Sequence, residues 1–315
     1  MQPAEPTLSR FANPLAKYLA ATRPAFLGVT LVACLIGFAS ARLNGFAVLL
    51  DKAWVTLCFA LVAHAGVNVI NDYYDALNGS DAANTGRIFP FTGGSRFIQN
   101  GVLSLRATAG FGYGLLLAVI PAGLWLMQVS SPDLFWIGLG GLLVGWAYSA
   151  PPLKLMARGL GELAIVAGWL FVVVGADMVL RGGFALQPWL AGLPYALLVA
   201  NILFINQFPD CEADALAGKR TLVVRLGPGE ARWGYLAIAA GAYGLLLFFV
   251  ARNLLPIYAA AGALALPLSF KAARQLLTHA AEPGRLAPAI KLSILAAHAS
   301  GLLLAAGLYF AGQLP

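Results

Sequence analysis

AWVTLCFALVAHAGVNVI, residues 53–70, contains no Asp, Glu, Lys or Arg and runs directly into NDYYDALNGSD, residues 71–81, which holds three aspartates. An uncharged apolar run of about 18 residues is long enough to be a candidate transmembrane helix. The acidic residues that follow it do not belong in hydrocarbon, so they place the end of the span and mark a polar site beside the membrane.

The rest of the chain repeats the apolar half of this pattern. Hydrophobic residues make up 60% of the 315 residues and charged residues only 10%, a composition typical of a protein that folds in lipid. We therefore predict an all-α, polytopic membrane protein with nine transmembrane helices around a central cavity. The predicted spans are 25–42, 53–71, 104–128, 133–150, 160–180, 188–207, 233–251, 254–272 and 288–311.

Basic residues divide unequally between the two ends of these spans. Sixteen of the 20 Lys and Arg residues fall on the side of the N-terminus, and Arg42, Lys52, Arg181 and Arg252 fall on the other side. The positive-inside rule then predicts a multi-pass protein of the inner (cytoplasmic) membrane with its N-terminus in the cytoplasm. The net charge of +7 suits anionic headgroups or an anionic substrate and gives no reason to expect a nucleic-acid partner.

We predict that the chain divides into two segments. Residues 1–24 are expected to form a cytoplasmic N-terminal segment, and residues 25–315 a single membrane domain. Little sequence is left for a separate soluble domain, and no obligate protein partner is evident. Asp177, near the opposite end of its span, is expected to reach the membrane surface.

Six of the 13 acidic residues gather in two short stretches, 72–81 and 210–214. These stretches end the second and sixth spans, which run in the same direction, so both are expected to face one cavity on the cytoplasmic side. Buried carboxylates that converge need a cation, and Mg²⁺ prefers oxygen ligands together with phosphates and water. The candidate metal ligands are Asn71, Asp72, Asp75, Asp81, Asp210 and Asp214.

Cations lie beside both acidic stretches, where they are expected to neutralise a diphosphate. Arg96 follows the first stretch, Lys154 follows the fourth span, and Lys219 and Arg220 follow the second stretch. Carboxylates, Mg²⁺ and Arg or Lys are the groups that bind diphosphates in proteins. A lipid-embedded cavity next to them would suit a diphosphate with a long apolar tail.

These motifs resemble those of the UbiA superfamily of intramembrane prenyltransferases, over essentially the whole chain. The likeness rests on NDYYDALNGSD (71–81) and DCEADALAGKRTL (210–222), and it extends to YSAPPLK (148–154) and GLGEL (159–163). GGSRFIQNGVLS (93–104) and AGKRTLVVRLG (217–227) are most similar to the 1,4-dihydroxy-2-naphthoate prenyltransferases of menaquinone synthesis. Pro209, however, stands where that branch usually has an arginine.

The resemblance implies that Mg²⁺ is the cofactor and that polyprenyl diphosphate and an aromatic acceptor are the substrates. It gives the catalytic role to Asp72, Asp75, Asp210 and Asp214, which would help the diphosphate to leave. The candidate acceptor pocket comprises His64, Asn68 and Tyr148, although His64 also fits the role of a polar core residue.

Two alternatives stay open at this point. Other acceptors in the same superfamily are 4-hydroxybenzoate, chlorophyll, haem and a glycerol-phosphate lipid. Intramembrane acids also mark ion pathways, so a divalent-cation transporter is the rival from another functional class.

Overall fold

The structure is a computed structural model, and it describes residues 4–11 and 13–314. These residues form helices and connecting loops, with no β-strand among them. The long helices are α2 (Pro24–Leu43), α3 (Leu50–Asn78), α5 (Leu105–Val129), α6 (Leu134–Ser149), α7 (Gly161–Arg181), α8 (Gln187–Leu216), α10 (Pro228–Ala251), α11 (Leu266–His279) and α12 (Ala287–Ala311). The short ones are α1 (Pro14–Ala21), α4 (Ser80–Ala83), α9 (Leu222–Leu226), and the 3₁₀ helices Met156–Arg158, Ile257–Ala265 and Pro283–Arg285.

Within the described part of the chain, seven helices are long and apolar enough to cross a membrane: α2, α3, α5, α7, α8, α10 and α12. The predicted all-helical membrane protein is confirmed at this level. The other two predicted spans take a different form. α6 has only 16 residues, and the span predicted at 254–272 is divided between the 3₁₀ helix Ile257–Ala265 and α11, which continues to His279.

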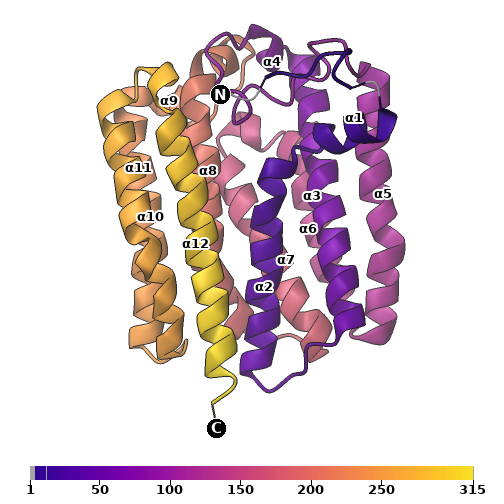
Figure 1. The fold of residues 1–315 in the computed structure, drawn as a ribbon, viewed down its shortest axis with the longest axis vertical. Helices are drawn as coiled ribbons and strands as arrows, with labels where there is room; N and C mark the ends of the chain where they lie inside the picture. The colour runs from indigo at the N-terminus through magenta and orange to yellow at the C-terminus, as the bar shows by residue number, and fades with distance from the viewer. Residues whose placement is uncertain (1–3, 12, 315) are drawn as a thin grey trace.

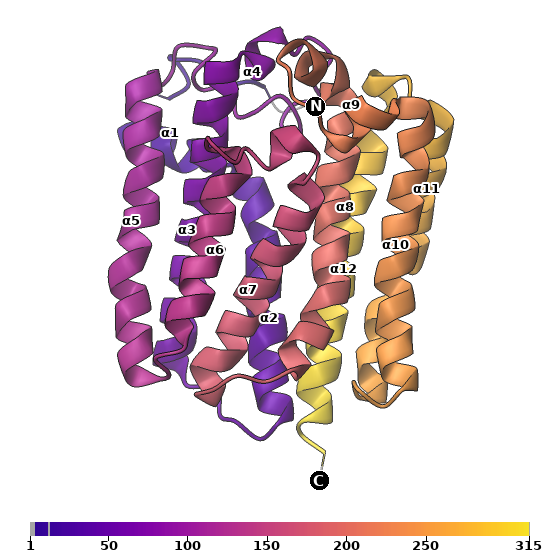
Figure 2. The same ribbon diagram turned by 180° about the vertical axis from the view of Figure 1, so that it is seen from behind.

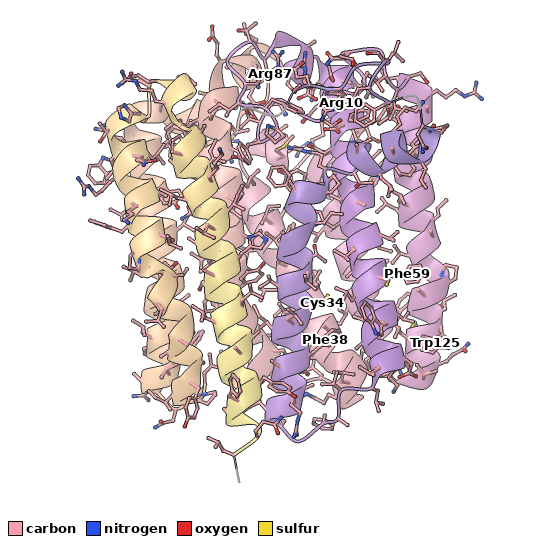
Figure 3. The ribbon with its side chains drawn as sticks, in the orientation of Figure 1. Arg10, Cys34, Phe38, Phe59, Arg87 and Trp125 are labelled. Atoms are coloured by element: carbon pink, nitrogen blue, oxygen red, sulfur yellow. The ribbon has the colours of Figure 1, made fainter. Side chains whose placement is uncertain are left out.

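The long helices run side by side along the long axis of the molecule (Figure 1). The short helices α1, α4 and α9 gather at one end together with the N-terminus, while the C-terminus leaves the opposite end (Figures 1 and 2). Arg10 and Arg87 lie at the end that holds the short helices, and Trp125 lies toward the other end (Figure 3). We call the first end the loop end of the bundle.

Small residues allow the helices to approach closely. A Cβ added at Gly301 of α12 would lie 2.6 Å from the ring of Tyr195 in α8, and one at Gly37 of α2 would lie 2.7 Å from Ala176 of α7. Close backbone approach at small residues is a common way to pack helices in lipid, where apolar burial drives association less than in water. The Tyr195 hydroxyl is also satisfied, since it donates to the carbonyl oxygen of Val29 over 2.7 Å.

The lengths of α3 and α8 position the polar site. They contain 29 and 30 residues, respectively, so each is about 44 Å long at 1.5 Å per residue, well beyond a hydrocarbon core of about 30 Å. Their extra turns both lie at the loop end and carry the acidic residues of the sequence motifs, except Asp81, which lies on α4. The helices that cross the membrane thus also present the acids beyond its apolar core.

Candidate active site

A cavity of about 400 Å³ lies between the ends of α3, α4 and α8 and continues down between the helices. Four of the predicted acids line it: Asp75 of α3, Asp81 of α4, and Asp210 and Asp214 of α8. The cavity therefore brings both acidic stretches together, as expected from spans that run in the same direction.

Lys219 lies between the two acidic stretches and joins them. Its Nζ is 2.9 Å from Oδ1 of Asp75 and 3.2 Å from Oδ1 of Asp214, and it donates to Oγ of Ser80 over 3.2 Å. The side chain is only 6% exposed. Burial disfavours the charged ammonium, but the carboxylates of Asp75 and Asp214 outweigh it and raise the pKa of Lys219 above its ordinary value. Lys219 is therefore a buried cation at the centre of the site.

Asp81 is held by the segment that follows α4. Arg96 donates from Nη1 to the backbone carbonyl of Asp81, and Gln99 donates to its Oδ2 over 3.4 Å. Gly94 has a φ of +71°, and its missing side chain makes room for the Asp81 carboxylate. Burial raises the pKa of Asp81 well above its ordinary range, and the nearby carboxylates of Asp75 and Asp72 raise it further. A cation beside Asp81 would offset both effects.

Oxygen atoms without a partner remain in the cavity wall. Asn84, which sequence analysis missed, donates from Nδ2 to Oδ1 of Asp210, and its own Oδ1 is buried with no hydrogen-bond partner. Oδ1 of Asn206 is likewise buried and unpartnered. Both residues line the cavity, so amide oxygens supplement its carboxylates.

This donor set fits Mg²⁺. Within residues 4–11 and 13–314, no three or more His, Cys, Asp or Glu side chains form a group that could hold a metal by themselves. Mg²⁺ does not need such a group, because it is usually bound by one or two carboxylates together with phosphate oxygens and water. Asp75, Asp81, Asp210 and Asp214 would hold it with help from the amide oxygens of the wall.

Asp72 has a different setting from the other predicted ligands. It is absent from the lining of the cavity, its Oδ1 accepts from the backbone N–H of Ser95 over 3.2 Å, and it lies 3.9 Å from Nη1 of Arg23. Asn71 does line the cavity, where its Nδ2 donates to Oδ2 of Asp75 and to Oγ of Ser149, both over 3.1 Å. Asn71 therefore orients the carboxylate of Asp75.

The predicted basic residues separate in the structure. Only Lys219 among them lines the main cavity. Arg96 does not line it and donates to the backbone carbonyl of Asp81. Lys154 lines a second pocket. Arg220 is exposed, and its backbone N–H donates to the carbonyl of Ala157 over 2.9 Å. Arg23 does line the cavity although the motifs gave no signal for it, because it precedes α2 and lies far from both acidic stretches in sequence.

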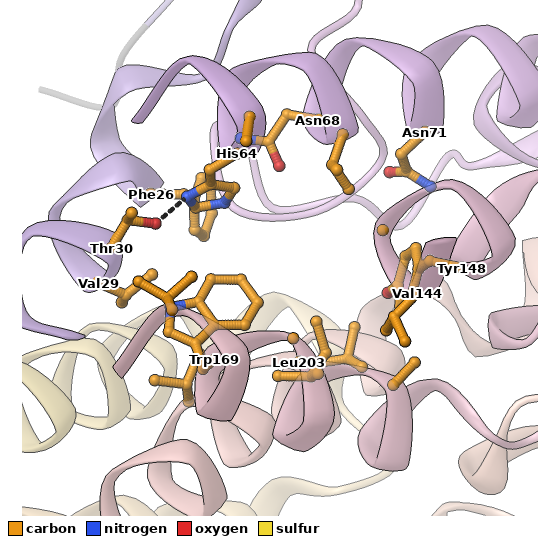
Figure 4. A pocket seen from close by; sticks show the side chains of 18 of the residues that line it. Phe26, Val29, Thr30, His64, Asn68, Asn71, Val144, Tyr148, Trp169 and Leu203 are labelled. Atoms are coloured by element: carbon orange, nitrogen blue, oxygen red, sulfur yellow. Dashed lines mark hydrogen bonds between the residues drawn. The ribbon is translucent and has the colours of Figure 1, made fainter. Parts of the chain in front are cut away.

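The predicted acceptor residues His64, Asn68 and Tyr148 all line the cavity (Figure 4). Nδ1 of His64 is hydrogen-bonded to the Thr30 hydroxyl over 2.8 Å, and its ring meets Trp169 edge-on with centroids 5.1 Å apart. Asn68 donates to the carbonyl of Thr22 over 3.0 Å. This part of the cavity offers a flat apolar wall and a few fixed polar groups, which is the usual character of a small-molecule site.

Below the aromatic wall the cavity is lined by apolar side chains and glycines, with Thr56 as a polar exception. Its lining continues to the opposite end of α5, α6 and α7, where Leu126, Leu134 and Val179 lie. Among the described residues that line it, every Asp belongs to the loop end, and no Glu contributes. The cavity thus combines one acidic end with a long apolar extension.

Comparisons with known proteins agree with this arrangement. The model of the UbiA prenyltransferase family matches residues 27–310. A 1,4-dihydroxy-2-naphthoate octaprenyltransferase from Mycobacterium tuberculosis is 32% identical over 228 residues, 70% of this chain and 73% of that protein. A chloroplastic chlorophyll synthase from Arabidopsis thaliana is 33% identical over 137 residues, 42% of this chain and 34% of that protein.

A solved structure shares the fold. A UbiA homologue from Archaeoglobus fulgidus bound to DMAPP and Mg²⁺ superposes with a TM-score of 0.58 at 17% identity, covering 91% of this chain and 99% of the other. The resemblance drawn from the motifs is confirmed by the family match, and with it the predicted enzyme class. This chain belongs to the UbiA prenyltransferase family.

Proposed function

We propose that this protein transfers a polyprenyl group from polyprenyl diphosphate to 1,4-dihydroxy-2-naphthoate, in a Mg²⁺-dependent step of menaquinone biosynthesis. The observation that carries the proposal is the single cavity in which Asp75 and Asp81 meet Asp210 and Asp214 above an apolar extension. Such a cavity suits a substrate with an anionic head and a long hydrocarbon tail.

The acidic end would bind the diphosphate. Mg²⁺ bound there would supply positive charge to the leaving diphosphate. Lys219, held between Asp75 and Asp214, places a buried ammonium at the same point, where charge develops as the allylic C–O bond breaks. Arg23 adds a second cation to the cavity wall.

The aromatic part of the cavity would bind the acceptor and shield the allylic cation. Tyr148 and Trp169 line it, and aromatic faces stabilise cations without reacting with them. The acceptor carbon takes the prenyl group at this level, between the acids and the apolar extension. For the naphthoate, loss of the carboxylate would accompany the transfer.

The membrane arrangement belongs to the same proposal. We assign nine crossings, with α6 and the pair formed by Ile257–Ala265 and α11 added to the seven long apolar helices. The loop end faces the cytoplasm of an inner (cytoplasmic) membrane, as the excess of Lys and Arg indicates. Residues 1–24 then lie in the cytoplasm, and the active site opens there.

A second acceptor class has support from the similarity to chlorophyll synthase. The test is to supply the purified protein in proteoliposomes with Mg²⁺, a labelled polyprenyl diphosphate and a panel of acceptors, each with and without chelator. We expect prenylated product from the naphthoate alone, and none after chelation. Product from chlorophyllide or 4-hydroxybenzoate instead would reassign the acceptor, and divalent-cation flux without any product would favour the transporter.

A further inference from the structure

A second, smaller pocket of about 180 Å³ lies beside the acidic end of the main cavity. The two share four lining residues, Asp75, Tyr148, Met156 and Lys219, which therefore form the partition between them. One water needs only about 10–15 Å³ of such space, so the pocket has room for a small hydrated anion.

Two of the four residues in the partition, Lys219 and Met156, have long unbranched side chains. Lys219 contributes a long flexible stem whose ammonium is held by Asp75, Asp214 and Ser80. Met156 contributes an unbranched thioether, 3.9 Å from Nδ2 of Asn71. Unbranched side chains of this kind change rotamer readily, so the partition can open without movement of a helix.

Lys154 stands on the far side of the partition. It is exposed and lines the second pocket but not the main cavity. Its backbone is held in the left-handed region with a φ of +45°, and its N–H donates to the carbonyl of Ala150 over 2.9 Å. Among the described residues, no hydrogen bond or ion pair engages its ammonium. The turn thus presents a free cation at the pocket.

We propose that the second pocket is the exit route for inorganic diphosphate. The anion would pass the ammonium group of Lys219 first and that of Lys154 second. The inference rests on the proposed function. When the allylic C–O bond breaks, its electron pair stays on the diphosphate oxygen, and the acceptor carbon forms the new bond to the prenyl group. The apolar extension offers no charge to an anion, whereas the second pocket begins at Lys219, next to the acidic end, and leads to the exposed Lys154.

The test separates a route from a binding site. Labelled inorganic diphosphate is bound to the Mg²⁺-loaded protein in nanodiscs, and its association and dissociation rates are measured by rapid filtration. The variants are K154R, K154M and K154E, and K291M serves as the control, because Lys291 is another exposed lysine at the loop end and lines neither pocket. All three Lys154 variants replace the same left-handed residue, so effects that follow side-chain charge are not due to backbone strain.

If Lys154 lies on the route, K154M slows both rates about tenfold, the lower end of effects produced by charge-lined clefts. K154E slows them further, K154R and K291M behave as wild type, and the dissociation constant changes little. Unchanged rates in K154M and K154E would overturn the proposal. A larger dissociation constant at an unchanged association rate would also overturn the proposal, because Lys154 would then be a binding residue.

The proposed function is judged separately in the same preparation. Normal diphosphate exchange without turnover of any acceptor would refute the proposed function and leave the route to be judged by the rates. A wild-type protein that binds no inorganic diphosphate in the presence of Mg²⁺ would refute both.

Discussion

Single side chains at the loop end have distinct tasks although the motif presents them together. Asp72 and Asp75 are three positions apart on α3, yet Asp75 faces the cavity and Lys219 while Asp72 accepts from the backbone of Ser95. The segment that contains Ser95 also supplies Gly94, which accommodates Asp81. We therefore expect Asp72 to hold the wall in place and Asp75 to face the substrate.

This difference predicts that an Asp-to-Asn substitution has different effects at positions 75 and 72. D75N should lower the rate of prenyl transfer by roughly 100-fold or more, as expected when a group that stabilises developing charge is lost. D72N should keep more activity and should instead lower the melting temperature, because Ser95 loses a charged acceptor. Single-turnover transfer and thermal unfolding in detergent measure the two effects. Equal loss of transfer, with both proteins folded, would restore Asp72 to the metal site predicted from sequence.

At the scale of elements, charged side chains gather near the ends of the helices. α7 shows this at a distance from the active site. Asp177 was expected to reach the membrane surface, but this prediction is wrong, since the residue is 0% exposed. Arg181, one turn along α7, donates from Nε and Nη2 to the two carboxylate oxygens over 2.6 and 2.8 Å. The pair neutralises both charges inside the bundle near its end.

Loss of one partner should therefore cost more than loss of both. D177L leaves Arg181 unpaired in a buried setting and should destabilise the protein by about 3 kcal/mol or more, the range found when one member of a buried pair is removed. The double variant D177L/R181M should recover part of that loss. R285M is a matched control, because the Arg285–Glu282 pair is 64% and 52% exposed and such pairs contribute little. Thermal unfolding of the four proteins measures the differences, and a double variant less stable than D177L would contradict this account.

At the scale of the whole molecule, the bundle encloses a cavity that is acidic at one end and apolar along the rest of its length. Glycines keep the apolar part open. Gly123 of α5 lines the cavity toward the end opposite the acids, and a Cβ added there would meet no atom within 4 Å. The space beside Gly123 is available to the distal part of a prenyl chain.

Filling that space should change the preferred chain length. G123L should lower kcat/KM for a long polyprenyl diphosphate by about tenfold, within the range for misfit in an apolar pocket, and should leave geranyl diphosphate unaffected. G114L is the control on the same helix, since Gly114 also has no atom within 4 Å of an added Cβ but does not line the cavity. Competition between the two donors measures the preference. An equal effect on both donors would place the prenyl chain elsewhere.

The sequence by itself determined the class of fold and the ends of most helices. Its apolar runs are long, and lipid requires every backbone polar group to be satisfied within a helix, so length and composition located the seven spans that long apolar helices form in the described residues. It also predicted that the two acidic stretches face one cavity, because spans two and six run in the same direction. The cavity that contains Asp75, Asp81, Asp210 and Asp214 agrees with that expectation.

Only the tertiary structure decided which side chains share a space. Spacing along one helix could not separate Asp72 from Asp75, since both lie near one stripe, and it gave no signal for Asn84 or Arg23. Lys154 and Lys219 looked equivalent in sequence, yet they line different pockets on either side of a partition. The physical reason is that the direction in which a side chain points, and the residue that it contacts, depend on how loops and neighbouring helices pack. That packing brings together residues that are far apart in the chain.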